Sequence, residues 1–169
     1  GWLHSSLTVA ADGNLRLSDE WQFEQDDKTF AVTELERATA SLQPLSSYYH
    51  ERVVEAHRPC ATVERIVEAT LQGSELVVQR LSNGGRDERR IAVTGDVTFP
   101  LVLRQRYRLG LCGRNADTTS AVVYDASTEE LRTNAVERSR QRTVEVEGKD
   151  VEVTELCERS ETGANVEWL

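Results

Sequence analysis

Apolar and polar residues alternate with a period of two along most of the chain, and this pattern constrains the fold more than any other feature. Successive side chains of a β-strand point to opposite faces, so an apolar residue at every second position marks one buried face. The pattern recurs at Leu15/Leu17, Trp21/Phe23, Phe30/Val32, Leu76/Val78, Ile91/Val93, Val122/Tyr124, Val144/Val146, Val151/Val153 and Val166/Trp168. The sequence therefore predicts an all-β domain of many short strands.

Turn-forming residues separate these strands. Gly, Asn and Asp, which tolerate tight turns and positive φ, occur in the segments 12–14, 25–28, 72–74, 82–85, 147–149 and 161–163. Tight turns join antiparallel neighbours, whereas parallel neighbours need long helical crossovers, which the sequence does not indicate. We therefore expect an antiparallel meander with at most one or two short helices.

The polar face of the predicted sheet carries many charges, so one side of the sheet is expected to face water. Examples are Glu64, Arg65 and Glu68, the run from Arg86 to Arg90, and Glu137 to Glu147. The apolar side must then be covered by curling of the sheet, by a second sheet, by a helix or by an apolar ligand. The expected architecture is a strongly curved meander, a half-barrel or an open barrel.

The segment from Phe99 to Gly110 is the main helix candidate. It has Pro100 near its start, a glycine at its end and three arginines in its last turns, as helices prefer. The spacing of Leu103, Tyr107 and Leu109 also fits a strand, so the pattern leaves both structures open. Residues 125–130 are expected to form a connection.

Length and charge limit the classes of function. The chain has 169 residues, 38% of them hydrophobic, which suits one domain spanning residues 1–169. A formal net charge of −9 disfavours nucleic acid and anionic lipid surfaces as partners. No apolar run is long enough to span a bilayer, and the start has neither Met nor a signal-peptide profile. We expect a piece of a larger protein.

No cluster of residues indicates catalysis, a cofactor or a metal. Cys60, Cys112 and Cys157 are widely spaced, so either two of them form a disulfide or all three are buried thiols. His57 lies three residues before Cys60, but a turn explains that spacing more simply than a catalytic pair. Neighbouring acidic residues such as Asp26 and Asp27 are expected in solvated turns. The sequence predicts a domain that is not an enzyme, with no catalytic residue, no cofactor and no metal.

Aromatic residues provide the candidates for ligand binding. Tyr48 and Tyr49 either line a cleft or lie in mid-strand with one ring buried and one half exposed. Phe99, Leu103 and Tyr107 lie on the candidate helix, where a helix laid across a sheet leaves a seam between two apolar surfaces. We predict that an apolar ligand, if one binds, lies beside the segment 99–109 and contacts Tyr48, Phe99, Leu103 and Tyr107. The alternative is that Leu101, Leu103, Tyr107 and Leu109 complete the core.

The order of several motifs resembles the all-β region that precedes a transglutaminase-like domain in exported bacterial proteins of unknown function. The resembling segments are 1–6 with Asp12 and Gly13, 45–48, 71–78, 122–128, 144–149 and 166–169. The resemblance implies an exported, periplasmic or cell-envelope location. It assigns no catalytic role here, because the family's catalytic residues lie in the downstream domain. In such relatives a further strand follows the tryptophan, so we expect the last hairpin to be truncated at Leu169.

The expected architecture is also similar to the half-barrel carriers of lipoproteins and lipids in the bacterial envelope, in which a curved sheet wraps a helical plug. That similarity implies a plug helix at 99–109. Two functions remain open at this point. The first is a non-catalytic domain that binds or positions a neighbouring domain of the same polypeptide or another envelope protein. The alternative is a carrier whose concave face holds a small apolar molecule such as a lipid or acyl chain.

Overall fold

Two largely antiparallel sheets and one helix make up the computed structural model, which describes residues 1–82, 84–109, 118–146, 148–160 and 163–168. The first sheet is a seven-stranded meander in chain order: β1 (Trp2–Val9), β2 (Leu15–Gln25), β3 (Lys28–Ala38), β4 (Pro44–Glu55), β5 (Arg58–Gln72), β6 (Glu75–Ser82) and β7 (Gly85–Ala92). Every neighbouring pair in it is antiparallel. The predicted all-β antiparallel meander is confirmed.

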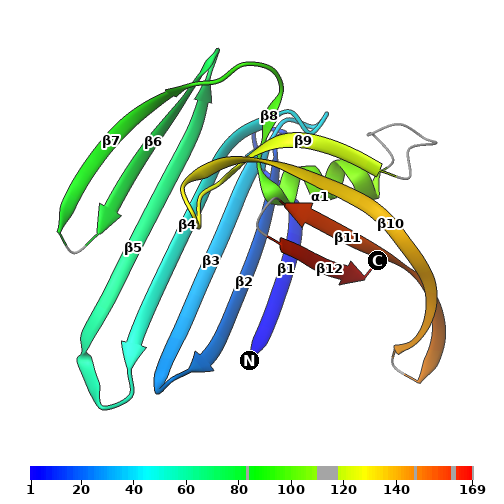
Figure 1. Ribbon diagram of the computed structural model, residues 1–169, viewed down its shortest axis with the longest axis horizontal. Coiled ribbons are helices and arrows are strands. Elements are labelled where there is room, and N and C mark those ends of the chain that lie inside the picture. The colour runs from blue at the N-terminus through cyan, green and yellow to red at the C-terminus, as the bar shows by residue number, and fades with distance from the viewer. Residues whose placement is uncertain (83, 110–117, 147, 161–162, 169) are drawn as a thin grey trace.

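The second sheet has five strands in the order β12-β11-β10-β9-β8. Its elements are β8 (Val97–Thr98), α1 (Pro100–Arg108), β9 (Thr118–Asp125), β10 (Glu130–Val146), β11 (Lys149–Ser160) and β12 (Gly163–Trp168). Figure 1 shows the long β10 and β11 arching away from the first sheet, so the two sheets form an open structure and no closed barrel.

Two features differ from expectation. The pairs Leu15/Leu17 and Trp21/Phe23 share one 11-residue strand, β2, so the strands are longer than the short ones predicted. The expectation that no helical crossover exists is wrong, because β8 pairs parallel to β9 through α1. A two-residue strand is too short to leave a period-two pattern in the sequence.

The predicted turns at 12–14, 25–28 and 72–74 lie between strands, whereas those at 82–85, 147–149 and 161–163 include residues outside the described ones. The segment that the pattern left open between helix and strand is a helix. The helix, Pro100–Arg108, begins one residue after Phe99, with proline at its first turn. The β2–β3 turn places Asp26 at φ 50° and Asp27 at φ 59°, and the turn at 126–129 connects β9 to β10. Tyr49 is buried and Tyr48 half-buried in mid-strand, as the strand interpretation predicted.

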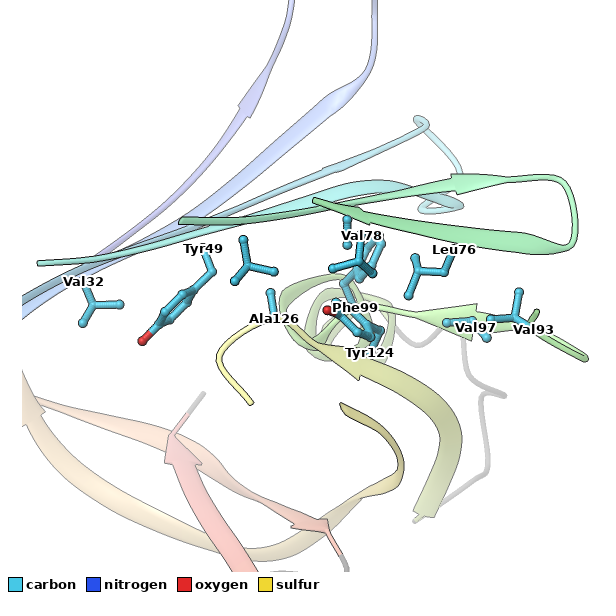
Figure 2. Close-up of a cluster of buried hydrophobic side chains, with 11 residues drawn as sticks. Val32, Tyr49, Leu76, Val78, Val93, Val97, Phe99, Tyr124 and Ala126 are labelled. Atoms are coloured by element: carbon cyan, nitrogen blue, oxygen red, sulfur yellow. The ribbon is translucent and has the colours of Figure 1, made fainter. Parts of the chain in front are cut away.

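The core lies on one face of the first sheet, here called the inner face, which packs against β8, α1 and β9. Val32, Tyr49, Leu76 and Val78 point from the first sheet towards Phe99 and its neighbours (Figure 2). The remaining members of this cluster are Val67, Ala69, Val93, Val97, Tyr124 and Ala126. The apolar side of the sheet is therefore covered by a helix and by a second sheet.

Charged residues do not all lie on the wet face as expected. Glu64 and Glu68 are exposed on the outer face, but Arg65 and Arg89 lie on the inner face. Their register partners show this, because Arg89 lies opposite the buried Val78 and Arg65 is next in line to Val67. Both arginines reach the second sheet, as described below.

Candidate functional site

A groove lies between α1 and the first two strands, on the inner face. It has a volume of about 440 Å³, within the range of small-molecule sites. Strands β1 and β2 and the exposed side of α1 supply its lining: Leu3, Ser5, Ser6, Leu7, Leu17, Ser18, Asp19, Leu101, Arg104, Gln105 and Arg108. Four leucines form the apolar part, and the serines and the charged groups form the polar part. We call this feature the helix groove.

An ion pair between α1 and β2 lies in the lining of the helix groove. Arg104 Nη1 lies 3.2 Å from Asp19 Oδ2, and both side chains are mostly buried. The pair joins α1 to β2, and Arg108 follows Arg104 one turn later on the same side of the helix. The groove therefore offers an amphipathic ligand an apolar wall of leucines and one exposed cation, Arg108.

A row of partly buried apolar side chains continues from the helix groove along the inner face. Leu3 of the groove lies opposite Trp21 on β2. Phe23 stacks on Phe30 across the β2–β3 pair, with ring centroids 4.7 Å apart and planes 2° from parallel. Val53 lies opposite Phe30 in the next strand. We call Trp21, Phe23, Phe30 and Val53 the aromatic row, and it extends the apolar surface beyond α1.

A buried carboxylate from the first sheet fixes the N-terminus of α1. The helix has no side-chain cap of its own and no acidic residue in its first turn. The backbone N–H groups of Leu101 and Val102 instead donate to Glu36 Oε1 and Oε2 on β3, at 3.1 Å and 2.7 Å. Glu36 thus satisfies two donors that an α-helix leaves free at its start.

Burial decides the charge state of this carboxyl. Glu36 is fully buried, and that burial raises its pKa well above the ordinary value of 4.5. The neighbouring Glu34 raises it further, while the two helix N–H groups and Arg104 oppose the shift. The folded chain therefore holds a proton at Glu36 more tightly than the unfolded chain does.

The C-terminal half of α1 is anchored from another direction. Arg106 Nε donates to the carbonyl of Leu42 at 2.9 Å, and its Nη1 lies 3.2 Å from Asp96 Oδ2. Together with Glu36 and Asp19, these contacts hold the helix over β2, β3 and the β3–β4 loop.

Three arginines of the first sheet surround one carboxylate of the β9–β10 turn. Arg65, Arg80 and Arg89 lie 3.7, 3.9 and 3.6 Å from the carboxylate of Glu129. Arg65 also donates to the carbonyl of Ser127 at 2.7 Å, and Arg89 to that of Glu129 at 2.6 Å. This cluster, the arginine clamp, fixes the second sheet against the inner face.

The structure separates the residues that the sequence proposed for ligand binding. Phe99 and Leu103 are fully buried and Tyr107 is nearly so, and all three lie in the core next to the helix groove without lining it. Tyr48 lies on the outer face, in a shallow depression of about 330 Å³ with Ile66, Glu68, Gln79, Arg80, Leu81 and Arg86. Ligand binding by these four residues stays a prediction.

Sequence reasoning missed the residues that do line the groove, although signals for some of them exist. Leu3 and Leu7 are four apart, which is compatible with one strand face, but Ser5 between them breaks the apolar pattern. Glu34 and Glu36 continue the inward-facing series of Val32, and two carboxyls in such positions mark a site with a polar partner. The partner itself lies on a distant segment.

The cysteine predictions fall mostly outside what the structure describes. Cys157 is a buried free thiol, whereas Cys112 and the side chain of Cys60 lie outside the described residues. His57 lies in an exposed turn, 3.8 Å from Asp27. Among the described residues, no group of three or more His, Cys, Asp or Glu side chains is placed to hold a metal ion.

The fold is an open all-β structure in which a curved meander is covered by the one helix of the described residues. No protein-family model and no curated protein matches the chain. Its structure is similar to the solved crystal structure of a beta-barrel-like protein of domain of unknown function DUF1849 from Brucella abortus. The TM-score is 0.62 at 12% identity, covering 94% of this chain and 69% of that one. This similarity supports the assignment of the chain as an all-β domain, and the function of the similar domain is itself unknown.

The association with a transglutaminase-like domain stays a prediction. In the described part of the chain, no helix has the length and apolar character needed to cross a membrane.

Proposed function

We propose that this domain is a non-catalytic carrier that holds an acyl chain, or a similar apolar chain with a polar end, on its inner face. The observation that carries the proposal is the helix groove, whose apolar wall continues into the aromatic row. A chain laid along Leu7, Leu3 and Trp21 exchanges exposed apolar surface for contact. Arg108, an exposed cation in the groove lining, suits a carboxylate or phosphate end.

The proposal is tested by titrating the domain with a fluorescent fatty acid. Leu7 is 47% exposed in the groove, and Leu81 on the outer face is 48% exposed, so they form a matched pair. Burying one leucine side chain contributes about 1.5–3 kcal/mol, which is roughly tenfold or more in affinity. Leu7→Ser should therefore weaken uptake about tenfold, and Leu81→Ser should leave it unchanged. A fatty acid that never binds the unmodified domain, or equal effects of both variants, would rule out the carrier.

The domain's lack of catalysis is part of the same proposal. Cys157 is buried and therefore poorly placed to act as a nucleophile. We expect no esterase or peptidase activity that depends on a cysteine. Any measurable hydrolysis that disappears on Cys112→Ser would contradict this expectation. An exported or envelope location, which the resemblance to exported bacterial proteins implies, is proposed with it.

Positioning of a protein partner is the second candidate function. A specific observation favours it, namely the uncharged free edge of the first sheet at β1. The following section develops the identity of the partner at that edge.

A further inference from the structure

The two edges of the first sheet are protected very differently. A free strand edge is a template for pairing with another strand, and proteins block such edges with charges, prolines or bulges. The edge strand β7 (Gly85–Ala92) carries five charged side chains, Arg86, Asp87, Glu88, Arg89 and Arg90. The opposite edge strand β1 reads Trp-Leu-His-Ser-Ser-Leu-Thr-Val, with no acidic or basic residue other than His4 and no proline. The β1 edge has none of the usual devices.

Strand β1 is also regular and fully exposed. Its register with β2 is continuous from Trp2 opposite Gln22 to Val9 opposite Leu15, with no bulge. All eight of its residues are exposed, and no described residue pairs with its outer edge. Four of them are large and apolar: Trp2 at 52%, Leu3 at 67%, Leu7 at 47% and Val9 at 71% exposure. A regular, uncharged and apolar strand of this kind suits strand pairing.

The sequence of β1 is complementary to itself. In an antiparallel pair centred on Ser5, Leu3 of one copy lies opposite Leu7 of the other, and Ser5 lies opposite Ser5. On the outer face the same register places His4 opposite Ser6 and Trp2 opposite Thr8. Directly opposite side chains share a face, so the leucines meet on the groove side. No register position brings two like charges together at neutral pH.

We propose that β1 pairs antiparallel with β1 of a second copy of this chain, with Ser5 on the two-fold axis. Each chain carries a formal net charge of −9, so two copies repel each other over most of their surfaces. The uncharged β1 is a place where they meet without that repulsion at contact. The two seven-stranded sheets become one continuous sheet across an isologous interface. The self-complementary register of β1 serves no purpose in pairing with a strand of a different protein. A second copy of this chain is therefore the favoured occupant.

The mass in solution tests the proposal, measured by sedimentation equilibrium. We expect twice the chain mass of 19.0 kDa, dissociating on dilution. Ser5→Lys places two ammonium groups opposite each other and should raise the dissociation constant at least tenfold, and Ser5→Asp should do the same with two carboxylates. Thr70→Lys, an exposed position on β5 in the interior of the sheet, is the matched control and should remain dimeric.

Mixing the two Ser5 variants separates pairing from misfolding. In a mixed dimer the introduced ammonium faces the introduced carboxylate, so an equimolar mixture should regain the doubled mass. A chain that stays monomeric up to about 1 mM overturns the proposal, because weaker pairing has no specificity. So does a Ser5→Lys variant that dimerises like the unmodified chain. A mixture that stays monomeric overturns the Ser5-centred register.

Discussion

The buried carboxyl of Glu36 provides the sharpest test of how the helix is positioned. Glu36→Ala removes the acceptor of two helix N–H groups, those of Leu101 and Val102. A buried donor left without an acceptor costs about 1–3 kcal/mol, so two such donors cost about 2–6 kcal/mol. The variant also removes the cost of burying the carboxyl beside Glu34. We therefore expect the free energy of unfolding to fall by about 2–4 kcal/mol, and by about 1 kcal/mol for Glu36→Gln, which keeps one acceptor oxygen.

The pH dependence of this effect has a definite sign. Burial raises the folded-state pKa of Glu36 above the ordinary 4.5, so its contribution to stability is fully present below pH 4.5. That contribution falls as the pH rises from there through the folded-state pKa, by up to about 1.4 kcal/mol per pH unit. Glu36→Gln cannot titrate. The stability advantage of the unmodified chain over this variant should therefore narrow with rising pH.

Urea unfolding followed by far-ultraviolet circular dichroism, repeated from about pH 4 to pH 8 where carboxyls lose their protons, measures both effects. Glu24→Gln is the matched control, because Glu24 is exposed on the neighbouring strand β2. Its difference from the unmodified chain should stay within about 0.5 kcal/mol at every pH. An advantage over Glu36→Gln that stays flat or widens with rising pH would refute the assigned burial of the carboxyl.

Four further substitutions test the packing, the arginine clamp and one turn by urea unfolding. Leu103→Ala should lower the free energy of unfolding by about 2–5 kcal/mol, because Leu103 is 1% exposed. Leu109→Ala, at a position 59% exposed, should lower it by less than about 0.5 kcal/mol. Equal losses would contradict the placement of Leu103 in the core. Glu129→Gln should lower the free energy of unfolding by about 1–2 kcal/mol, because it leaves three guanidinium groups without their carboxylate. Added salt should reduce that loss, and a loss independent of salt would contradict the arginine clamp. Asp27→Gly should raise stability by roughly 0.5–1 kcal/mol, since it relieves a left-handed φ of 59°, and a loss of stability would contradict that strain.

The meander could be predicted from sequence because its determinants are local. Alternation within a strand and the turn chemistry after it lie within a few residues of each other, as in Phe30 and Val32 after the turn at Asp26 and Asp27. The helix at 100–108 remained open for a physical reason. Pro100, Leu101, Val102 and Leu103 are all buried, so its first turn has no polar side to reveal the period of a helix.

The helix groove and its supports could not be predicted because they join distant segments. Glu36 contacts the N–H of Leu101 across 65 residues, and Arg65 reaches Ser127 across 62. A charged residue at an inward position of a strand indicates a buried partner, but the sequence does not identify that partner. From the sequence alone, Arg65 is therefore assigned to the solvated face, although in the structure it contacts the second sheet.

The position of α1 explains why β1 carries both proposals. Three anchors tie the helix to the first sheet: Glu36 on β3, Asp19 on β2 and the carbonyl of Leu42 after β3. With these anchors α1 covers β2 and β3, while every residue of β1 is exposed. Leu3 and Leu7 then line a groove on one face while the backbone of the same strand forms a free edge. The ligand uses the side chains of Leu3 and Leu7, whereas the second copy pairs mainly with the backbone of β1 and uses these two leucines as cross-strand contacts. Leu7→Ser should therefore change fatty-acid uptake more than dimer mass, and the Ser5 charge variants should change the mass whether or not a ligand is present.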